Sequence, residues 1–143
     1  MIEDIIAQYE EQLVAIRRDL HANPELQFQE HRTAAVVADI LSQLGFEVTT
    51  GIAGTGVVGT LRNGSDERAI AIRADMDALP ITETTGVSHC STVPGVMHAC
   101  GHDGHTTMVL GLAFYLSTNR NFDGTVHLIF QPAEEDISGA LRM

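Results

Sequence analysis

One apolar run that ends in acidic residues constrains the fold of this chain more than any other stretch. Residues 69–72 (Ala-Ile-Ala-Ile) are apolar at odd and even positions alike, as expected for a strand covered on both faces of a sheet. The run passes directly into residues 73–80, which include Asp75 and Asp77. Open α/β sheets bind ligands beyond the carboxyl ends of their strands. The sequence therefore predicts a central strand with a ligand-binding end, although an Arg73–Asp75 pair that only closes a loop is an alternative.

Three helices are expected around this strand. Apolar residues recur at three- and four-residue steps from Ile2 to Leu20, which predicts one amphipathic helix that ends at Asn23-Pro24. A second helix is predicted over residues 31–44, with Gly45 in the left-handed position that follows a helix. A third is predicted over residues 103–117.

Two polar residues flank the predicted end of the first helix. His21 is interpreted as a cation at a helix end, and Glu25 as a solvated carboxylate.

Further strands are predicted over residues 46–50, 57–61 and 125–130. The turn at residues 63–66 (Asn-Gly-Ser-Asp) predicts that residues 56–62 and 68–74 form a hairpin. Residues 81–96 lack a clear period and are expected to form an extended loop. The order of the elements favours an α/β fold with a mixed, largely buried central sheet flanked by helices.

Composition narrows the classes of function. The 143 residues fit one domain, and eight basic against 19 acidic residues give a formal charge of −11, which disfavours nucleic acid and anionic membranes as partners. The longest apolar run, residues 108–116, is too short to cross a bilayer, and the amino terminus has no signal-peptide pattern. A cytoplasmic location is therefore expected, with Cys90 and Cys100 reduced and Cys90 simply packed.

Residues 97–105 (Met-His-Ala-Cys-Gly-His-Asp-Gly-His) gather three histidines, a cysteine and an aspartate around two glycines. Thiolate and imidazole are usual ligands of zinc-like cations, and carboxylates complete such sites. Packing or helix capping would explain a single histidine here. The amides at the start of the following helix are expected to favour the thiolate of Cys100.

A second cluster, residues 131–136 (Gln-Pro-Ala-Glu-Glu-Asp), directly follows the predicted strand 125–130. Consecutive carboxylates repel one another unless solvent or a cation holds them. Pro132 breaks the strand, which allows Glu134 and Glu135 to face one site. His127, inside the strand, is interpreted as a hydrogen-bonded histidine without a functional role.

Together the clusters predict a catalytic metal site. Cys100, His102 and one glutamate would supply three ligands, and the other glutamate would take a proton from the attacking water and pass it to a leaving amine. Asp77 would fix a ligand histidine through its second ring nitrogen, and His105 is a reserve ligand. A rival interpretation makes Cys100 a nucleophile with His102 or His105 as its base.

Four segments, taken together, resemble one protein family. Residues 17–26, 73–80, 98–105 and 131–135 occur in the order found in the N-terminal half of N-acyl-amino-acid amidohydrolases, such as hippurate hydrolase and the auxin-conjugate hydrolases. These enzymes belong to the metallopeptidase clan of aminoacylases and carboxypeptidases. The resemblance extends over nearly the whole chain.

The resemblance implies specific roles. Cys100, His102 and Glu135 would be metal ligands, Glu134 the general base and Asp77 the residue that orients the metal site. Two divalent ions such as Zn, Mn, Ni or Co would be bound, and the reaction would be hydrolysis of the amide of an N-acyl amino acid or peptide. The implied fold is the α/β catalytic domain of dinuclear zinc peptidases.

Family members continue beyond the Glu-Glu motif into a lid and dimerisation domain and two further histidine ligands. Residues 1–143 would thus be a truncated, N-terminal part of the catalytic domain, inactive or nearly so alone. Such a part would expose a sheet edge and an apolar face and could form homo-oligomers. The alternative is a non-catalytic remnant that folds, self-associates and binds metal weakly or not at all.

Overall fold

The computed structural model describes residues 2–135 and 139–143. Along the chain it places three helices, three strands, one long helix, a fourth strand and a short final helix. These elements are α1 (Ile2–Ala7), α2 (Glu10–Ala22), α3 (His31–Gln43), β1 (Glu47–Ile52), β2 (Gly56–Asn63), β3 (Ala69–Asp75), α4 (His102–Thr118), β4 (Gly124–Gln131) and α5 (Gly139–Arg142).

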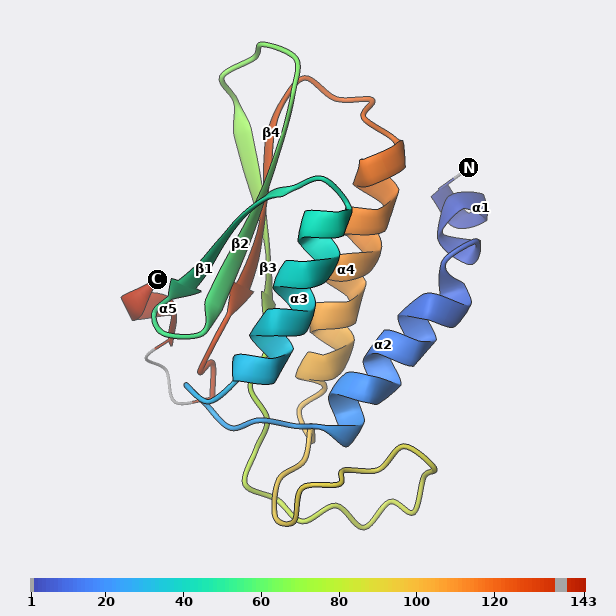
Figure 1. Ribbon diagram of the computed structural model, residues 1–143, viewed down its shortest axis with the longest axis vertical. Coiled ribbons are helices and arrows are strands. Elements are labelled where there is room, and N and C mark those ends of the chain that lie inside the picture. Colours follow the sequence, from blue (N-terminus) through green and yellow to red (C-terminus); the bar gives the residue numbers. More distant parts are fainter. Residues whose placement is uncertain (1, 136–138) are drawn as a thin grey trace.

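The four strands form one mixed sheet in the order β1-β2-β4-β3. The β1–β2 and β2–β4 pairs are antiparallel, whereas β3 and β4 run parallel. Helices α3 and α4 pack on one face of this sheet, and α2 lies against α4 as an outer layer (Figure 1). The predicted α/β class with a mixed sheet and flanking helices is thus confirmed.

The predicted hairpin between residues 56–62 and 68–74 is wrong, because β4 lies between β2 and β3. Contacts of the connecting turn explain the difference. The Asn63 side-chain amide donates to the carbonyl oxygen of Phe122 (2.5 Å), and the Asp123 carboxylate accepts hydrogen bonds from the amides of Ser65 and Asp66 (2.8 Å each). The turn therefore packs against the segment that leads into β4, and β4 takes the place beside β2.

The prediction that residues 69–72 form a central strand covered on both faces is also wrong. β3 is an edge strand, and residues 69–71 are exposed, with Ile70 59% accessible. The strand becomes buried only at Ala74 and Asp75, where α4 covers its end. β3, like β1 on the other side of the sheet, has an outer edge without a neighbouring strand among the described residues.

The single helix predicted from Ile2 to Leu20 is divided into α1 and α2. The amide of Tyr9 donates to the carbonyl oxygen of Ile6 (2.9 Å), a tight bond that ends the first helix. The Tyr9 ring then stacks on Phe114 of α4, with 4.8 Å between ring centroids. This contact fixes the bend between the two helices against α4.

The second predicted helix is confirmed as α3, including its end. Gly45 has a left-handed φ of 82°. The Phe46 amide donates to the Leu41 carbonyl oxygen (3.0 Å) and the Gly45 amide to that of Ser42 (3.1 Å). This is the Schellman arrangement that satisfies the last carbonyl groups of a helix.

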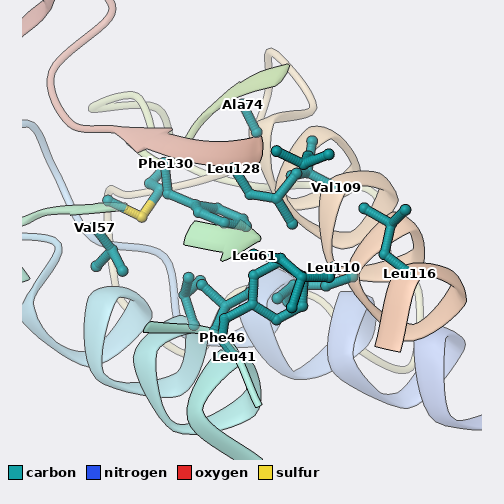
Figure 2. Packing of buried hydrophobic residues seen from close by; sticks show 14 residues of the cluster. Leu41, Phe46, Val57, Leu61, Ala74, Val109, Leu110, Leu116, Leu128 and Phe130 are labelled. Carbon is teal, nitrogen blue, oxygen red and sulfur yellow. The ribbon is translucent and has the colours of Figure 1, made fainter. Parts of the chain in front are cut away.

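The hydrophobic core lies between the sheet and the two helices that cover it (Figure 2). Leu41 of α3 and Leu110 of α4 meet Val57, Leu128 and Phe130 from β2 and β4, and all five are fully buried. Because α4 is packed between the sheet and α2, it is buried on several sides and its apolar residues do not form a single stripe.

None of the helices in the described part of the chain is long and apolar enough to cross a membrane.

Candidate metal centre

Three segments that are far apart in the sequence meet at one end of the sheet. The parallel strands β3 and β4 finish side by side, with Asp75 opposite Gln131. The amide of Met76 donates to the Gln131 carbonyl oxygen (3.0 Å), and this hydrogen bond keeps the two segments together where the strands end. Helix α4 starts at the same place and packs on β3. The sequence predicted a ligand-binding end on a central strand; the acidic residues of that segment do lie at the carboxyl end of β3, but β3 is an edge strand.

Cys100, His102 and Glu135 come together there. Each offers one donor atom, and these three atoms lie within 4.8 Å of one another. His102 is 2% exposed, while Cys100 is exposed and Glu135 half-buried. The sequence prediction placed these residues at one point, and the structure brings them there. Asp136, the third acidic residue of the second cluster, lies outside the described residues.

The ring of His102 is held by Asp77. Its Nδ1 lies 2.8 Å from the Asp77 carbonyl oxygen and 3.2 Å from Oδ1 of the same residue. Both partners accept hydrogen bonds, so Nδ1 carries the proton and Nε2 faces the opposite side of the ring. As expected from the sequence, Asp77 contacts one ring nitrogen of His102 and leaves the other, Nε2, for a metal.

Carboxylates crowd around Nε2 of His102. Oxygen atoms of Asp75, Glu134 and Glu135 lie 3.7, 3.8 and 3.8 Å away. Burial lowers the pKa of His102, but the hydrogen bond to Asp77 and the charges of Asp75 and Asp77 outweigh burial, so the pKa is raised. The site therefore favours a positive charge, supplied by a proton or a cation, at Nε2.

Asp77 also holds the second ligand segment. It is 1% exposed, and its Oδ2 accepts a hydrogen bond from the amide of Glu135 (3.1 Å). Burial would raise the pKa of Asp77, but the hydrogen bonds from His102 and from the amides of Glu135 and Glu134 outweigh it and the pKa is lowered. The ionised carboxylate thus links the imidazole of His102 to the backbone of Glu135.

The donor set fits a divalent metal ion. One carboxylate oxygen of Glu135, Oε1, is buried and has no hydrogen-bond partner among the described residues. A buried polar atom without a partner calls for a ligand, and here it points to the same place as Nε2 of His102. Sulfur, nitrogen and carboxylate donors are the set that zinc-like ions prefer.

The expected stabilisation of the Cys100 thiolate is wrong for the metal-free protein. A hydrogen bond to Glu135, followed by burial and the charges of Glu135, Glu134 and Asp75, raises the pKa of Cys100 to about 11. Gly101, with φ of 94°, is the cap residue of α4, so Cys100 lies outside the helix. Because a nucleophilic cysteine must be ionised, this charge environment also disfavours the rival interpretation of Cys100 as a nucleophile.

The other histidines considered in the sequence analysis, His105, His98 and His127, do not belong to the Cys100–His102–Glu135 group. His105 is 47% exposed at its side chain, and its Nδ1 lies 2.6 Å from Oδ1 of Asp75. Asp75, His102 and His105 form a second possible ligand group, which shares His102 with the first. His98 is buried, and burial lowers its pKa to about 4. His127 bonds to the Thr60 hydroxyl (2.9 Å), as expected for a histidine without a functional role.

His21 lies in the last turn of α2, as interpreted, but its partners were not predicted, and the interpretation of Glu25 as a solvated carboxylate is wrong. His21 is buried, and its two ring nitrogens lie 2.8 Å from Asp103 and 3.2 Å from Glu83. Glu25 accepts hydrogen bonds from the amides of Arg32 and Thr33 (2.9 and 2.8 Å), so it caps the start of α3 instead of being solvated.

Sequence reasoning also missed Glu30, which is fully buried. Its carboxylate accepts hydrogen bonds from the Thr55 hydroxyl (2.5 Å) and from the amide of Ala133 (2.9 Å). Ala133 has a left-handed φ of 49° and directly precedes Glu134. The available signal was an acidic residue immediately before a predicted helix, which is common at solvated helix starts and does not reveal a distant partner.

Comparisons with known proteins agree with this geometry. The chain is 52% identical to hippurate hydrolase of Campylobacter jejuni over 128 residues, which cover 90% of this chain and 33% of the relative. It is 47% identical to thermostable carboxypeptidase 2 of Saccharolobus solfataricus, covering 94% of this chain and 35% of the relative. The crystal structure of the Bacillus subtilis YXEP protein, a dinuclear metal-binding peptidase of the M20 family, matches with a TM-score of 0.90 and 43% identity, over 95% of this chain and 39% of that protein.

The chain thus spans about a third of the length of the curated relatives that it matches. Residues 71–143, which hold the ends of β3 and β4 and the start of α4, match the sequence profile of peptidase family M20/M25/M40. This match covers half of the chain and includes the whole candidate metal centre, so the chain belongs to peptidase family M20/M25/M40.

Proposed function

We propose that the whole protein containing this chain hydrolyses the amide bond of N-acyl amino acids with the help of bound divalent metal ions. The observation that carries the proposal is the meeting of Cys100, His102 and Glu135 at one point, beside a further carboxylate, Glu134. Similarity to a hippurate hydrolase supports the substrate class, because hippurate is an N-acyl amino acid. Similarity to a carboxypeptidase makes small peptides the second candidate substrate.

Cys100, His102 and Glu135 would hold the metal, and Asp77 would orient two of these three ligands. When bound, a divalent ion such as Zn, Mn, Ni or Co polarises the amide carbonyl and lowers the pKa of water at the site. The described residues offer two overlapping sets of three donors, and the first is Cys100, His102 and Glu135. The second candidate group, Asp75 with His102 and His105, needs the same imidazole, so the two groups cannot be filled at once.

Glu134 would be the general base. Its side chain is 39% exposed, so it can reach a substrate, and its Oε2 lies 3.8 Å from Nε2 of His102. The Glu134 carboxylate takes a proton from the attacking water as the oxygen bonds to the carbonyl carbon. It then delivers that proton to the amide nitrogen as the C–N bond breaks, which leaves a carboxylic acid and a free amino acid.

The 143-residue chain by itself is expected to hydrolyse amides weakly or not at all. The donors among its described residues suffice for one ion, and its relatives are about three times as long. The alternative is a non-catalytic remnant that folds and self-associates but binds metal weakly or not at all. The exposed edge strand β3 makes self-association physically reasonable in either case.

Cobalt titration tests this proposal directly, because a thiolate ligand gives Co²⁺ a characteristic charge-transfer absorption. We expect the unaltered chain to bind one equivalent with this absorption, and Cys100→Ser, His102→Ala and Glu135→Gln to lose it. Glu134→Gln is the matched control, since it removes the neighbouring carboxylate without removing a proposed ligand. Absence of cobalt binding to the unaltered chain would favour the remnant.

The role of Glu134 is tested in the complete protein with hippurate as substrate. Glu134→Gln is expected to lower turnover by about 10²–10⁴-fold while metal content stays constant. If metal is lost instead, the roles of the two glutamates are exchanged. Detectable hippurate hydrolysis by the purified 143-residue chain would contradict the expected inactivity of that chain.

A further inference from the structure

A group of four charged side chains, Arg17, His21, Glu83 and Asp103, lies beside the metal centre and is hereafter the charged cluster. Oδ2 of Asp103 is 2.8 Å from Nε of Arg17 and 2.8 Å from Nδ1 of His21. On the other side of the ring, Nε2 of His21 is 3.2 Å from Oε1 of Glu83. The side chains of His21, Glu83 and Asp103 are 7%, 2% and 0% exposed, so the two contacts of His21 are shielded from solvent, whereas Arg17 is 41% exposed.

The charged cluster joins three separate parts of the chain. Arg17 and His21 belong to α2, Asp103 to the first turn of α4, and Glu83 to the long loop between β3 and α4. Glu83 is itself tied into that loop, because its Oε2 accepts a hydrogen bond from the amide of Ser91 (2.6 Å). The loop is therefore fastened to α2 and, through His21, to the start of α4.

The cluster pairs two basic side chains, Arg17 and His21, with the two carboxylates of Glu83 and Asp103. Both ring nitrogens of His21 face carboxylate oxygens, so each contact is a hydrogen bond only if both nitrogens carry protons. The Thr85 hydroxyl and the Ser91 amide lower the pKa of Glu83 to about 2, which keeps this carboxylate charged.

Such a buried ionic group adds little to the free energy of folding, because the cost of removing its charges from water offsets most of their mutual attraction. Its best-attested use is to select one arrangement of the segments that it joins. A role in stability alone thus accounts poorly for three nearly inaccessible charged side chains next to a metal centre.

The segments that the charged cluster joins include two of the proposed metal ligands, Cys100 and His102. Asp103 directly follows His102, and Gly101 separates His102 from Cys100 with a left-handed φ of 94°. Glycine leaves the backbone unusual freedom at this point, so the distance between thiol and imidazole depends on what holds each flank. The charged cluster holds the Asp103 flank. On the other flank, Met97 and Leu79 exchange two backbone hydrogen bonds of 3.0 Å each.

We propose that His21 is a positioning residue for the Cys100–His102 pair: by bridging Asp103 and Glu83, it fixes the first turn of α4 against the loop that leads to Cys100. The identity of the two ligands in this inference rests on the function proposed above. The orientation of the first helical turn does not.

The test compares three variants of the 143-residue chain. His21→Leu removes the contacts of His21 with both Asp103 and Glu83. Glu83→Gln leaves the contact with Asp103 and weakens only the one between His21 and residue 83. Asp19→Asn is the matched control, because it breaks an exposed ion pair of α2 with Arg32 (2.9 Å) without touching the charged cluster. Cooperative thermal unfolding, followed by circular dichroism, establishes that each variant is folded.

The first measurement is amide hydrogen exchange of the metal-free chain. The amides of Gly104 and His105 bond to the Gly101 carbonyl oxygen in the first turn of α4, and the amide of Asn119 bonds to Tyr115 at its end. We expect His21→Leu to speed exchange at Gly104 and His105 by about tenfold relative to Asn119. Glu83→Gln should have a smaller effect in the same place, and Asp19→Asn none.

The second measurement is cobalt affinity. Residues that orient metal ligands typically change affinity by about 10–100-fold when replaced, and this loss is expected for His21→Leu with a weakened thiolate absorption. Uniformly faster exchange along α4, unchanged exchange, or local exchange with undiminished cobalt affinity would each overturn the inference. If His21→Leu does not fold, Glu83→Gln decides by the same criteria. If the unaltered chain binds no cobalt, the proposed function fails, and the exchange pattern alone decides whether His21 fixes the helix start.

Discussion

Asp77 accepts hydrogen bonds from two segments that carry proposed ligands, from His102 through Oδ1 and from the Glu135 amide through Oδ2. An asparagine at this position would direct its NH₂ group toward one of these two N–H donors. We expect Asp77→Asn to weaken cobalt binding by about 10–100-fold while the chain stays folded. Isothermal titration calorimetry on the 143-residue chain measures this loss.

The matched control for Asp77 is Asp123→Asn. Asp123 also accepts two backbone hydrogen bonds, from Ser65 and Asp66, but it lies just before β4 begins, at the end of the strand opposite to the metal centre. Its replacement should leave cobalt affinity unchanged. Equal losses in the two variants would mean that Asp77 affects only the stability of the fold.

The raised pKa of Cys100 gives a pH-dependent prediction. The thiol is half ionised only near pH about 11 instead of at its ordinary value of 9.0, because Glu135 and neighbouring carboxylates disfavour the thiolate. In a Cys90→Ser background without metal, alkylation by iodoacetamide should therefore be slow at pH 8 and its rate should rise until pH about 11. Glu135→Gln should shift this rise to lower pH. A midpoint at or below pH 9 in the unaltered site would contradict the prediction.

At the scale of single residues, the sequence pointed to those that stand in short motifs rich in possible metal ligands. Cys100 and His102 stand in one short motif, and Glu135 in another, so their convergence could be predicted. His21 and Glu30 could not be recognised, because their partners Asp103 and Ala133 lie 82 and 103 residues away. Nothing in the neighbouring sequence distinguishes such residues from solvated polar residues beside helix ends.

At the scale of elements, Glu30 fastens the beginning of α3 to the segment that follows β4. Glu30→Ala would leave the Ala133 amide and the Thr55 hydroxyl buried without partners, at a cost of about 1–3 kcal/mol for each. We expect the free energy of unfolding in urea to fall by at least about 2 kcal/mol.

Glu30→Gln provides the control for this prediction. The glutamine keeps an oxygen for the Ala133 amide, and its NH₂ group can donate to the Thr55 hydroxyl after that hydroxyl rotates. Its loss of stability should be clearly smaller than that of Glu30→Ala. Similar values for the two variants would show that the hydrogen bonds of Glu30 contribute little.

Elements with strong local signals were predicted well. Helix α3 ends at Gly45 as its pattern indicates, and β4 agrees with its apolar run before Pro132. Strand pairing was not predicted, because a turn sequence such as residues 63–66 specifies a change of direction and not the neighbour of the next strand. The contacts of that turn with Phe122 and Asp123 decide that β4 enters between β2 and β3.

For the whole molecule, the exposed edge of β3 predicts self-association. Its outer side has no neighbouring strand among the described residues, and Ile70 is 59% exposed. An open apolar edge can pair with the same edge of a second copy. We expect Ile70→Lys to lower the dimer fraction in sedimentation velocity over a concentration series. Met108→Lys, which charges an equally exposed position on α4, should leave that fraction unchanged. A strictly monomeric unaltered chain would contradict this expectation.

The parallel course of β3 and β4 has a consequence for when the proposed metal site can form during folding. The two strands are joined through the long loop and α4, so their carboxyl ends become neighbours only after this crossover is complete. Pairing of segments so distant in sequence is a slow event in folding, so an ion held by Cys100, His102 and Glu135 would find these three donors together only afterwards. Added metal should therefore leave the rate of refolding unchanged and slow unfolding, because the ion would bind only to the folded chain.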